Sequence, residues 1–245
     1  MRRILDEMKY QQKRGTGVGK DYKPWIQVGE FGSSGTASCP IDWKNGRTMQ
    51  LLSQAEAMVY HLLRYNDVVV DIREQYPLDI KETLTIAKQL GVNHPFYNKK
   101  PTVMTTDLLA TLTDGSYLAV SVKATSDEFE KLKTKKKCSI EQAYWLSKGA
   151  KYVQIAKDQL NPILYDNIRT CVAFYDEKYI CDKHSIVKHL IAHHLLDVDI
   201  SKEHLDYEEL TIKFRKEIEQ WQTLKLETKS KSVKLPGECY RLLMG

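Results

Sequence analysis

The stretch TVMTTDLLATLTDGSYLAVSVKA, residues 102–124, decides the fold that we predict for this chain. Its two halves, 102–112 and 117–124, are rich in β-branched and apolar residues, which favour strands. Between them stands Asp114-Gly115, a pair typical of the tight turn of a β-hairpin. The stretch therefore predicts two adjacent antiparallel strands.

The predicted hairpin brings polar residues together. Asp107 lies in the first strand and Lys123 near the end of the second. Ser121 and Lys123 are two residues apart and project from one face, whereas Val122 between them points to the other. Charged residues are unusual inside strands, because burying an unpaired charge is costly. We therefore expect Asp107 to lie near Ser121 and Lys123 across the ladder.

The segments before the hairpin predict two helices and a strand. Ser53 and Glu56 have the spacing of a helix capping box, and apolar residues then recur at helical intervals, which predicts a helix over about 53–65. The Val- and Ile-rich run over 67–78 predicts a strand that stops at a proline. Residues 81–91 predict a helix closed by a glycine.

A basic segment, residues 131–137, follows the hairpin. It precedes a helical stretch over 138–149, for which Ser139 is the expected cap, and a strand over 151–156. This order of helices and strands predicts an α/β fold with a mixed sheet flanked by helices.

Beyond Asn161-Pro162 the pattern becomes predominantly helical. We predict a domain boundary near residue 160, with an α/β domain over 1–160 and a smaller, mainly helical domain over 161–245. Both lengths fall within the usual range for domains.

Composition indicates a globular protein of the cell interior. Of the 245 residues, 42% are hydrophobic and 28% are charged, and the formal net charge is +5. This charge permits binding to nucleic acid without requiring it. The cysteines are scattered and odd in number, which favours reduced thiols: Cys39, Cys138, Cys171, Cys181 and Cys239. No signal peptide or membrane span is expected, so we predict a cytoplasmic protein with no membrane partner.

Glu56, Asp107 and Lys123 are the minimal parts of a site for metal-assisted hydrolysis of a phosphodiester. Carboxylate oxygens are the ligands that Mg²⁺ prefers. A lysine can orient the attacking water or stabilise the charge that develops on the phosphate. Glu56 also has a purely structural interpretation, because its spacing from Ser53 is that of a capping residue.

Seven ordered segments between about residues 17 and 170 resemble the TnsA family, the endonuclease subunit of heteromeric cut-and-paste transposases. They are GVGKDYKPW, LLSQAEAMVYHLL, VVVDIREQYPL, HPFYNKKPTVMTTDLL, AVSVKA, EQAYW and QIAKDQLNP. The resemblance implies a restriction-endonuclease-like N-terminal domain and a winged-helix-like C-terminal domain for partner contact. It also implies Mg²⁺-dependent cleavage, with Mn²⁺ able to substitute, of the 5′ strands at transposon ends. The implied partners are transposon-end DNA, a TnsB-type DDE transposase and a TnsC-type AAA+ regulator, in the nucleoid of a prokaryotic cell.

By position, the catalytic residues of the family fall on Glu56, Asp107 and Lys123. Ser121 stands where this nuclease superfamily usually has Glu or Asp, and where TnsA relatives can have Gln. A serine hydroxyl is a weak neutral ligand. The candidate metal ligands are therefore Glu56, Asp107, Ser121, the Val122 backbone carbonyl and Glu141 on the following helix, with water as an alternative for the contact that Ser121 makes weakly.

Other residues are candidates for DNA contact. Arg73 and Gln75 alternate onto one face of the predicted strand, where they either touch DNA or brace Glu56. The basic segment either follows a phosphate backbone or is a solvated loop. Its candidate residues are Lys131, Lys133, Lys135, Lys136 and Lys137.

Two alternative functions stay open at this point. A stand-alone restriction or repair nuclease of the same fold would cut DNA without partners. A catalytically decayed adaptor would bridge the transposase and the AAA+ regulator, and Ser121 is the feature that supports it.

Overall fold

The structure, a computed structural model, describes residues 5–30 and 36–233. The chain divides into two compact units, Met1–Tyr165 and Asp166–Gly245. Among the described residues no helix is long and apolar enough to cross a membrane. Four cysteines in this part are free thiols, and Cys239 lies outside it.

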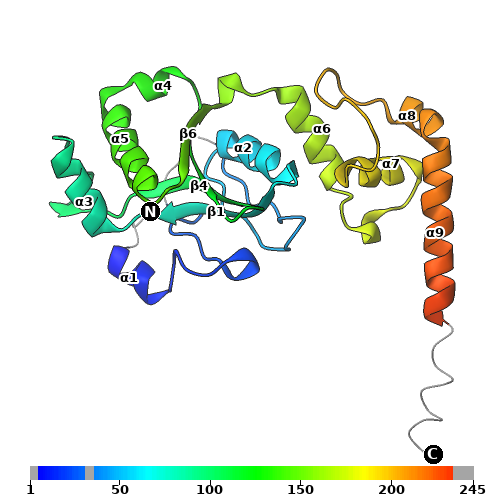
Figure 1. The fold of residues 1–245 in the computed structure, drawn as a ribbon, viewed down its shortest axis with the longest axis horizontal. Coiled ribbons are helices and arrows are strands. Elements are labelled where there is room, and N and C mark those ends of the chain that lie inside the picture. The colour runs from blue at the N-terminus through cyan, green and yellow to red at the C-terminus, as the bar shows by residue number, and fades with distance from the viewer. Residues whose placement is uncertain (1–4, 31–35, 234–245) are drawn as a thin grey trace, which may run out of the picture. The chain divides into compact units, whose positions relative to one another are not determined.

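The first unit is built on a mixed four-stranded sheet with the order β1-β4-β5-β6 (Figure 1). β1 pairs with β4 and β4 with β5 in antiparallel fashion, whereas β5 and β6 are parallel. The mixed sheet flanked by helices predicted from the sequence is therefore present. The strands are β1 (Val69–Pro77), β4 (Thr105–Leu112), β5 (Tyr117–Lys123) and β6 (Lys151–Ala156).

The turn between β4 and β5 fixes the register of the sheet at the place that the sequence predicted. Gly115 has a φ of +82°, a conformation that glycine adopts without strain. Leu112 N donates to Ser116 O at 2.9 Å and closes the turn. From there the pairing runs to Leu108 opposite Val120. Continued by one residue, this register sets Asp107 beside the end of β5.

Helices cover both faces of the sheet. α2 (Gln54–Tyr65) packs on one face, where alternate strand residues such as Leu108 and Val120 form its apolar partners. α5 (Leu132–Ser147) and α3 (Ile80–Gln89) lie on the other face, against Leu109 and Ala119 (Figure 1). The alternation of side chains along the strands thus produces two apolar layers.

Shorter elements complete this unit. A two-stranded hairpin, β2 (Phe96–Tyr97) and β3 (Lys100–Pro101), precedes β4. The remaining helices are α1 (Asp6–Gln11), α4 (Asp127–Glu130) and the 3₁₀ turns η1 (Gly19–Asp21) and η2 (Lys157–Gln159).

The start of α5 corrects the sequence prediction. The helix begins at Leu132, so residues 132–137 of the basic segment are helical. Ser139, the expected cap, lies inside the helix, where its hydroxyl donates to Lys136 O at 2.9 Å. Lysine is a good helix former, so the run of lysines extends the helix in the N-terminal direction.

The second unit is helical in its described part, residues 166–233, where no strand occurs. A winged-helix-like arrangement accordingly remains a prediction. Phe214 separates the last two described helices of this unit. The elements are α6 (Pro162–Val172), η3 (Glu177–Tyr179), α7 (Lys183–Ala192), α8 (Tyr207–Lys213) and α9 (Arg215–Val233).

Candidate active site

Asp107 and Lys123 meet at the end of the β4–β5 pair. Val122 N donates to Asp107 Oδ2 at 2.7 Å, so the carboxylate is held by the neighbouring strand. Lys123 Nζ lies 3.6 Å from the same oxygen and donates to Val122 O at 2.6 Å. The ammonium group therefore lies against one carboxylate oxygen and one backbone carbonyl, which are two of the predicted metal ligands.

Glu56 occupies the first turn of α2, as the capping-box spacing predicted. Its carboxylate accepts bonds from Leu52 N at 3.0 Å, Ser53 Oγ at 3.1 Å and Gln75 Nε2 at 3.3 Å. Burial, followed by the negative charge of Asp107, raises the pKa of Glu56 to about 7. Asp107 on β4 is therefore close enough to Glu56 on α2 for its negative charge to disfavour ionisation of Glu56.

Glu141 brings a third carboxylate from α5. Its side chain is buried, with 1% exposed. Neither carboxylate oxygen meets the geometry of a hydrogen bond, although the Thr106 hydroxyl lies near enough to lower the pKa of Glu141. Burial raises the pKa of Glu141 to about 7; Lys137 lowers this pKa and Asp107 raises it. An unpaired buried carboxylate is costly, so it calls for a proton or a cation.

Lys137 belongs to this cluster, although the sequence grouped it with the lysines of a surface segment. Burial acts to lower its pKa, but the carboxylates of Asp107, Glu141 and Glu56 outweigh that effect, and the pKa of Lys137 is raised. Its spacing of four residues from Glu141 would have placed both on one helix face. That signal was hidden because the helix was expected to begin after Lys137.

Gln75 braces Glu56, one of the two roles considered for it. Only 2% of Gln75 is exposed; its amide donates to Glu56, and its carbonyl oxygen accepts from Thr105 Oγ1 at 3.1 Å. The backbone of Gln75 has a φ of +47°, a strained conformation for this residue type. Strain of this kind persists where the surroundings hold it in place, often at functional sites.

Arg73 is also buried and bonded within the protein. Its guanidinium donates to Thr111 Oγ1 at 3.1 Å and lies over the rings of Tyr76 and Tyr117, at 5.1 and 5.4 Å from their centroids. These contacts favour a structural role for Arg73 over contact with DNA.

Ser121 is 1% exposed, and its hydroxyl lies 3.9 Å from Cys138 Sγ on α5.

The predicted DNA-binding lysines take different positions. Lys131 is the residue before α5, and Lys135 pairs with Glu130 at 2.7 Å. The other three predicted lysines line a cavity, and Lys123 lines it too. These three are Lys133, Lys136 and Lys137.

The chemistry of the donors fits a hard divalent cation, because Glu56, Asp107, Glu141 and the Val122 carbonyl all offer oxygen. The two unpaired oxygens of Glu141 are the observation that most directly calls for a cation. Within the described residues, no three His, Cys, Asp or Glu side chains form a ready-made metal cluster. An ion would therefore draw on side-chain and backbone oxygens together.

Two comparisons with known proteins give a match to this chain. Residues 66–157 match the family described as TnsA-like endonuclease N terminal. The Escherichia coli protein "Transposon Tn7 transposition protein TnsA" is 37% identical over 163 residues, which cover 64% of this chain and 58% of that protein. This chain is therefore similar to the TnsA family over part of its length. The segment matched to the TnsA-like family contains Asp107, Lys123 and Glu141, whereas Glu56 precedes it.

The match to the Escherichia coli protein covers only part of that protein's length. The chain spans 58% of the length of its Escherichia coli TnsA relative. The mixed sheet with helices on both faces is the restriction-endonuclease-like architecture expected of a TnsA domain.

Proposed function

We propose that this chain is a Mg²⁺-dependent DNA endonuclease that cuts the 5′ strands at transposon ends. The observation that carries the proposal is the contact of Asp107 Oδ2 with both Val122 N and Lys123 Nζ, on a TnsA-like domain. Glu56 lies within the electrostatic reach of Asp107. These are the carboxylates and the lysine that metal-assisted phosphodiester hydrolysis requires.

The proposed ligands of the ion are those predicted from the sequence: Glu56, Asp107, Ser121, the Val122 carbonyl and Glu141. Because the described acidic side chains do not form a ready-made cluster, they would have to draw together when an ion binds. When bound, Mg²⁺, or Mn²⁺ in its place, lowers the pKa of water and offsets charge on the phosphate. Binding would require Lys123 to leave the Val122 carbonyl, to which it now donates at 2.6 Å. The released ammonium could then face the phosphate and stabilise its developing charge.

Glu56 contributes through its position as well as its charge. Three donors hold its carboxylate at the start of α2, so its orientation is set before any substrate binds. With a pKa of about 7, Glu56 can hold or release a proton near neutral pH.

The family points to the substrate and partners. We propose transposon-end DNA as the substrate, a TnsB-type DDE transposase that cuts the 3′ strands, and a TnsC-type AAA+ regulator. The second unit, Asp166–Gly245, is the proposed site of partner contact. Tethering by a partner would raise the effective concentration of the nuclease at the ends, which suits a chain with a net charge of only +5.

Strand mapping on end-labelled transposon-end DNA tests this function. The chain is incubated with Mg²⁺ alone, with its transposase, and with transposase and regulator. Cleavage of the 5′ strands that requires the transposase supports the proposal. Efficient cleavage by the chain alone would favour a stand-alone nuclease, and no cleavage with no divalent-ion binding on DNA would favour an adaptor.

A further inference from the structure

A cavity of about 820 Å³ opens beside the candidate active site. Its lining includes Lys123 from the site and Leu52, whose backbone N–H donates to Glu56 at 3.0 Å. The start of α5 and the segment 93–105, which carries the β2–β3 hairpin, both contribute to its lining. We call this cavity the side groove.

The side groove is cationic. None of the described aspartate or glutamate residues lines it. Four of its lining residues are lysines: Lys123, Lys133, Lys136 and Lys137. Three of these lysines stand in the first two turns of α5, where positive charge opposes the helix dipole. A bound phosphate backbone would offset both the lysine charges and the dipole.

Phe96 gives the groove an aromatic surface. Phe96 is 60% exposed, and Leu132 at the start of α5, which also lines the groove, is 69% exposed. An exposed aromatic ring beside lysines is the combination that binds an unpaired nucleotide, through stacking on the base and ionic contact with the backbone. An apolar protein partner would instead favour a groove without this density of charge.

The hairpin that carries Phe96 is held in place by its own turn and by His94, two residues before the hairpin begins. Asn98 and Lys99 both have positive φ values, 48° and 62°, as in the tight turn that matches strand twist. His94 is buried, with its Nε2 3.1 Å from Thr83 Oγ1 on α3. The ring of Phe96 is therefore presented from a fixed support.

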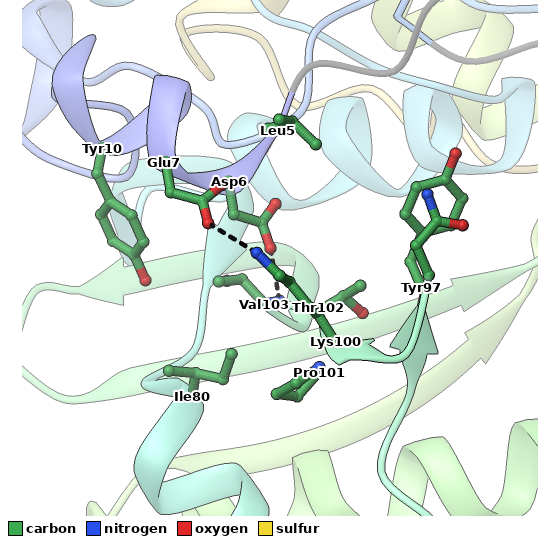
Figure 2. A pocket seen from close by; sticks show the side chains of 11 residues that line it. Leu5, Asp6, Glu7, Tyr10, Ile80, Tyr97, Lys100, Pro101, Thr102 and Val103 are labelled. Atoms are coloured by element: carbon green, nitrogen blue, oxygen red, sulfur yellow. Dashed lines mark hydrogen bonds and ion pairs between the residues drawn. The ribbon is translucent and has the colours of Figure 1, made fainter.

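The other side of the hairpin rests on α1. Asp6 Oδ2 accepts from Val103 N at 3.1 Å, and Lys100 Nζ lies 4.0 Å from Glu7 Oε1 (Figure 2). Tyr97 lines a second cavity, between the hairpin and α1 (Figure 2), and does not line the side groove. Adjacent residues of one hairpin thus line different cavities, which supplies a matched control.

We propose that the side groove binds the DNA strand next to the cut and that Phe96 stacks on a base displaced from the duplex. The inference rests on the proposed function, since the groove opens on the nuclease site. It predicts a preference for DNA with unpaired bases near the cut. Lys133 and Lys136 contact the backbone and add affinity for any DNA.

Fluorescence anisotropy without divalent ions tests the proposal, with transposon-end duplexes that are fully paired or carry a short mismatched segment at the cut. We expect the unmodified chain to prefer the mismatched duplex, and Phe96→Ala to reduce affinity for it by about tenfold with little effect on the paired duplex. Tyr97→Ala should leave the preference unchanged, and Lys136→Gln should weaken both complexes and lower their salt dependence.

Equal affinity of the unmodified chain for the two duplexes would overturn the proposal. So would equal losses in Phe96→Ala and Tyr97→Ala. Quenching of 2-aminopurine placed at the mismatch reports stacking directly, and it should diminish in Phe96→Ala alone. Because no step requires cleavage, a chain that shows this Phe96-dependent binding but never cuts DNA would contradict the proposed function while supporting the groove.

Discussion

At the scale of single residues, the candidate site combines charges that the fold leaves incompletely balanced. Glu56 and Glu141 are both buried beside Asp107, and the pKa of each is raised to about 7. Only Glu56 has hydrogen-bond partners for its carboxylate. Glu141 is therefore the residue at which charge costs most stability when no cation is bound.

Glu141→Gln should stabilise the metal-free chain at high pH. The folded-state pKa of Glu141, about 7, lies above its ordinary value of 4.5. The folded chain thus binds a proton that the unfolded chain has lost, so stability falls as pH rises between these values and stays low above them. We expect the melting temperature of Glu141→Gln to be higher by roughly 2–4 °C at about pH 8 and unchanged at about pH 5.

The matched control is Glu82→Gln. Glu82 is 43% exposed and pairs with Lys148 on the surface, so it should show no such pH-dependent gain. A Glu141→Gln variant that melts lower than the unmodified chain at high pH would contradict this description of the carboxylate.

Residue spacing predicted part of this site. The Asp-Gly turn fixes the register, so Asp107 and Lys123 could be placed together from the sequence alone. The positive φ of Gln75 could not be predicted, because it depends on tertiary contacts with Glu56 and Thr105. Lys137 was predicted only as a DNA contact, because the helix was expected to begin after it and its i,i+4 relation to Glu141 was not recognised.

At the scale of elements, the residues at which α2 and α5 begin decide where Glu56 and Lys137 lie. α2 begins directly after Ser53, whose hydroxyl accepts from Glu56 N, and this N-cap was predicted from the sequence. The Glu56 carboxylate accepts from Leu52 N and not from Ser53 N, so the reciprocal bond of a capping box is replaced by one to the preceding residue. α5 begins seven residues before its expected cap at Ser139. A run of lysines is compatible with both loop and helix, so only packing of the later turns against the sheet decides between them.

Ser53→Ala should destabilise the chain by about 1 kcal/mol, because Glu56 N loses its acceptor at the start of α2. Ser139→Ala is the control: its hydroxyl bonds within the middle of α5, and its loss should change the free energy of unfolding by less than about 0.5 kcal/mol. Urea denaturation measures both. Equal losses in the two variants would show that Ser53 does not act as a cap.

At the scale of the whole molecule, the site lies within the first compact unit, and the second unit has its own internal supports. Asn167 donates to Ile200 O at 3.0 Å and Glu203 O at 2.7 Å, and accepts from Leu205 N at 3.3 Å. This buried amide ties α6 to the segment before α8. The change to a helical pattern near residue 160 was visible in the sequence, whereas these contacts were not.

Asn167→Ala should lower the free energy of unfolding by about 2 kcal/mol, because it leaves buried backbone groups unpaired. Calorimetric titration with Mn²⁺ should give the same affinity as the unmodified chain, since every proposed ligand lies in the first unit. Loss of Mn²⁺ affinity in a folded Asn167→Ala variant would contradict that assignment.

The central claim is that Asp107 and its neighbours form a metal-dependent nuclease site. The most direct measurement is nicking of labelled transposon-end DNA by the chain with its transposase, in Mg²⁺ or Mn²⁺, for the unmodified protein and Asp107→Asn. We predict ion-dependent nicking that falls by about a hundredfold or more in Asp107→Asn, with assembly on DNA intact. Nicking by Asp107→Asn at the unmodified rate, or without any divalent ion, would contradict the claim.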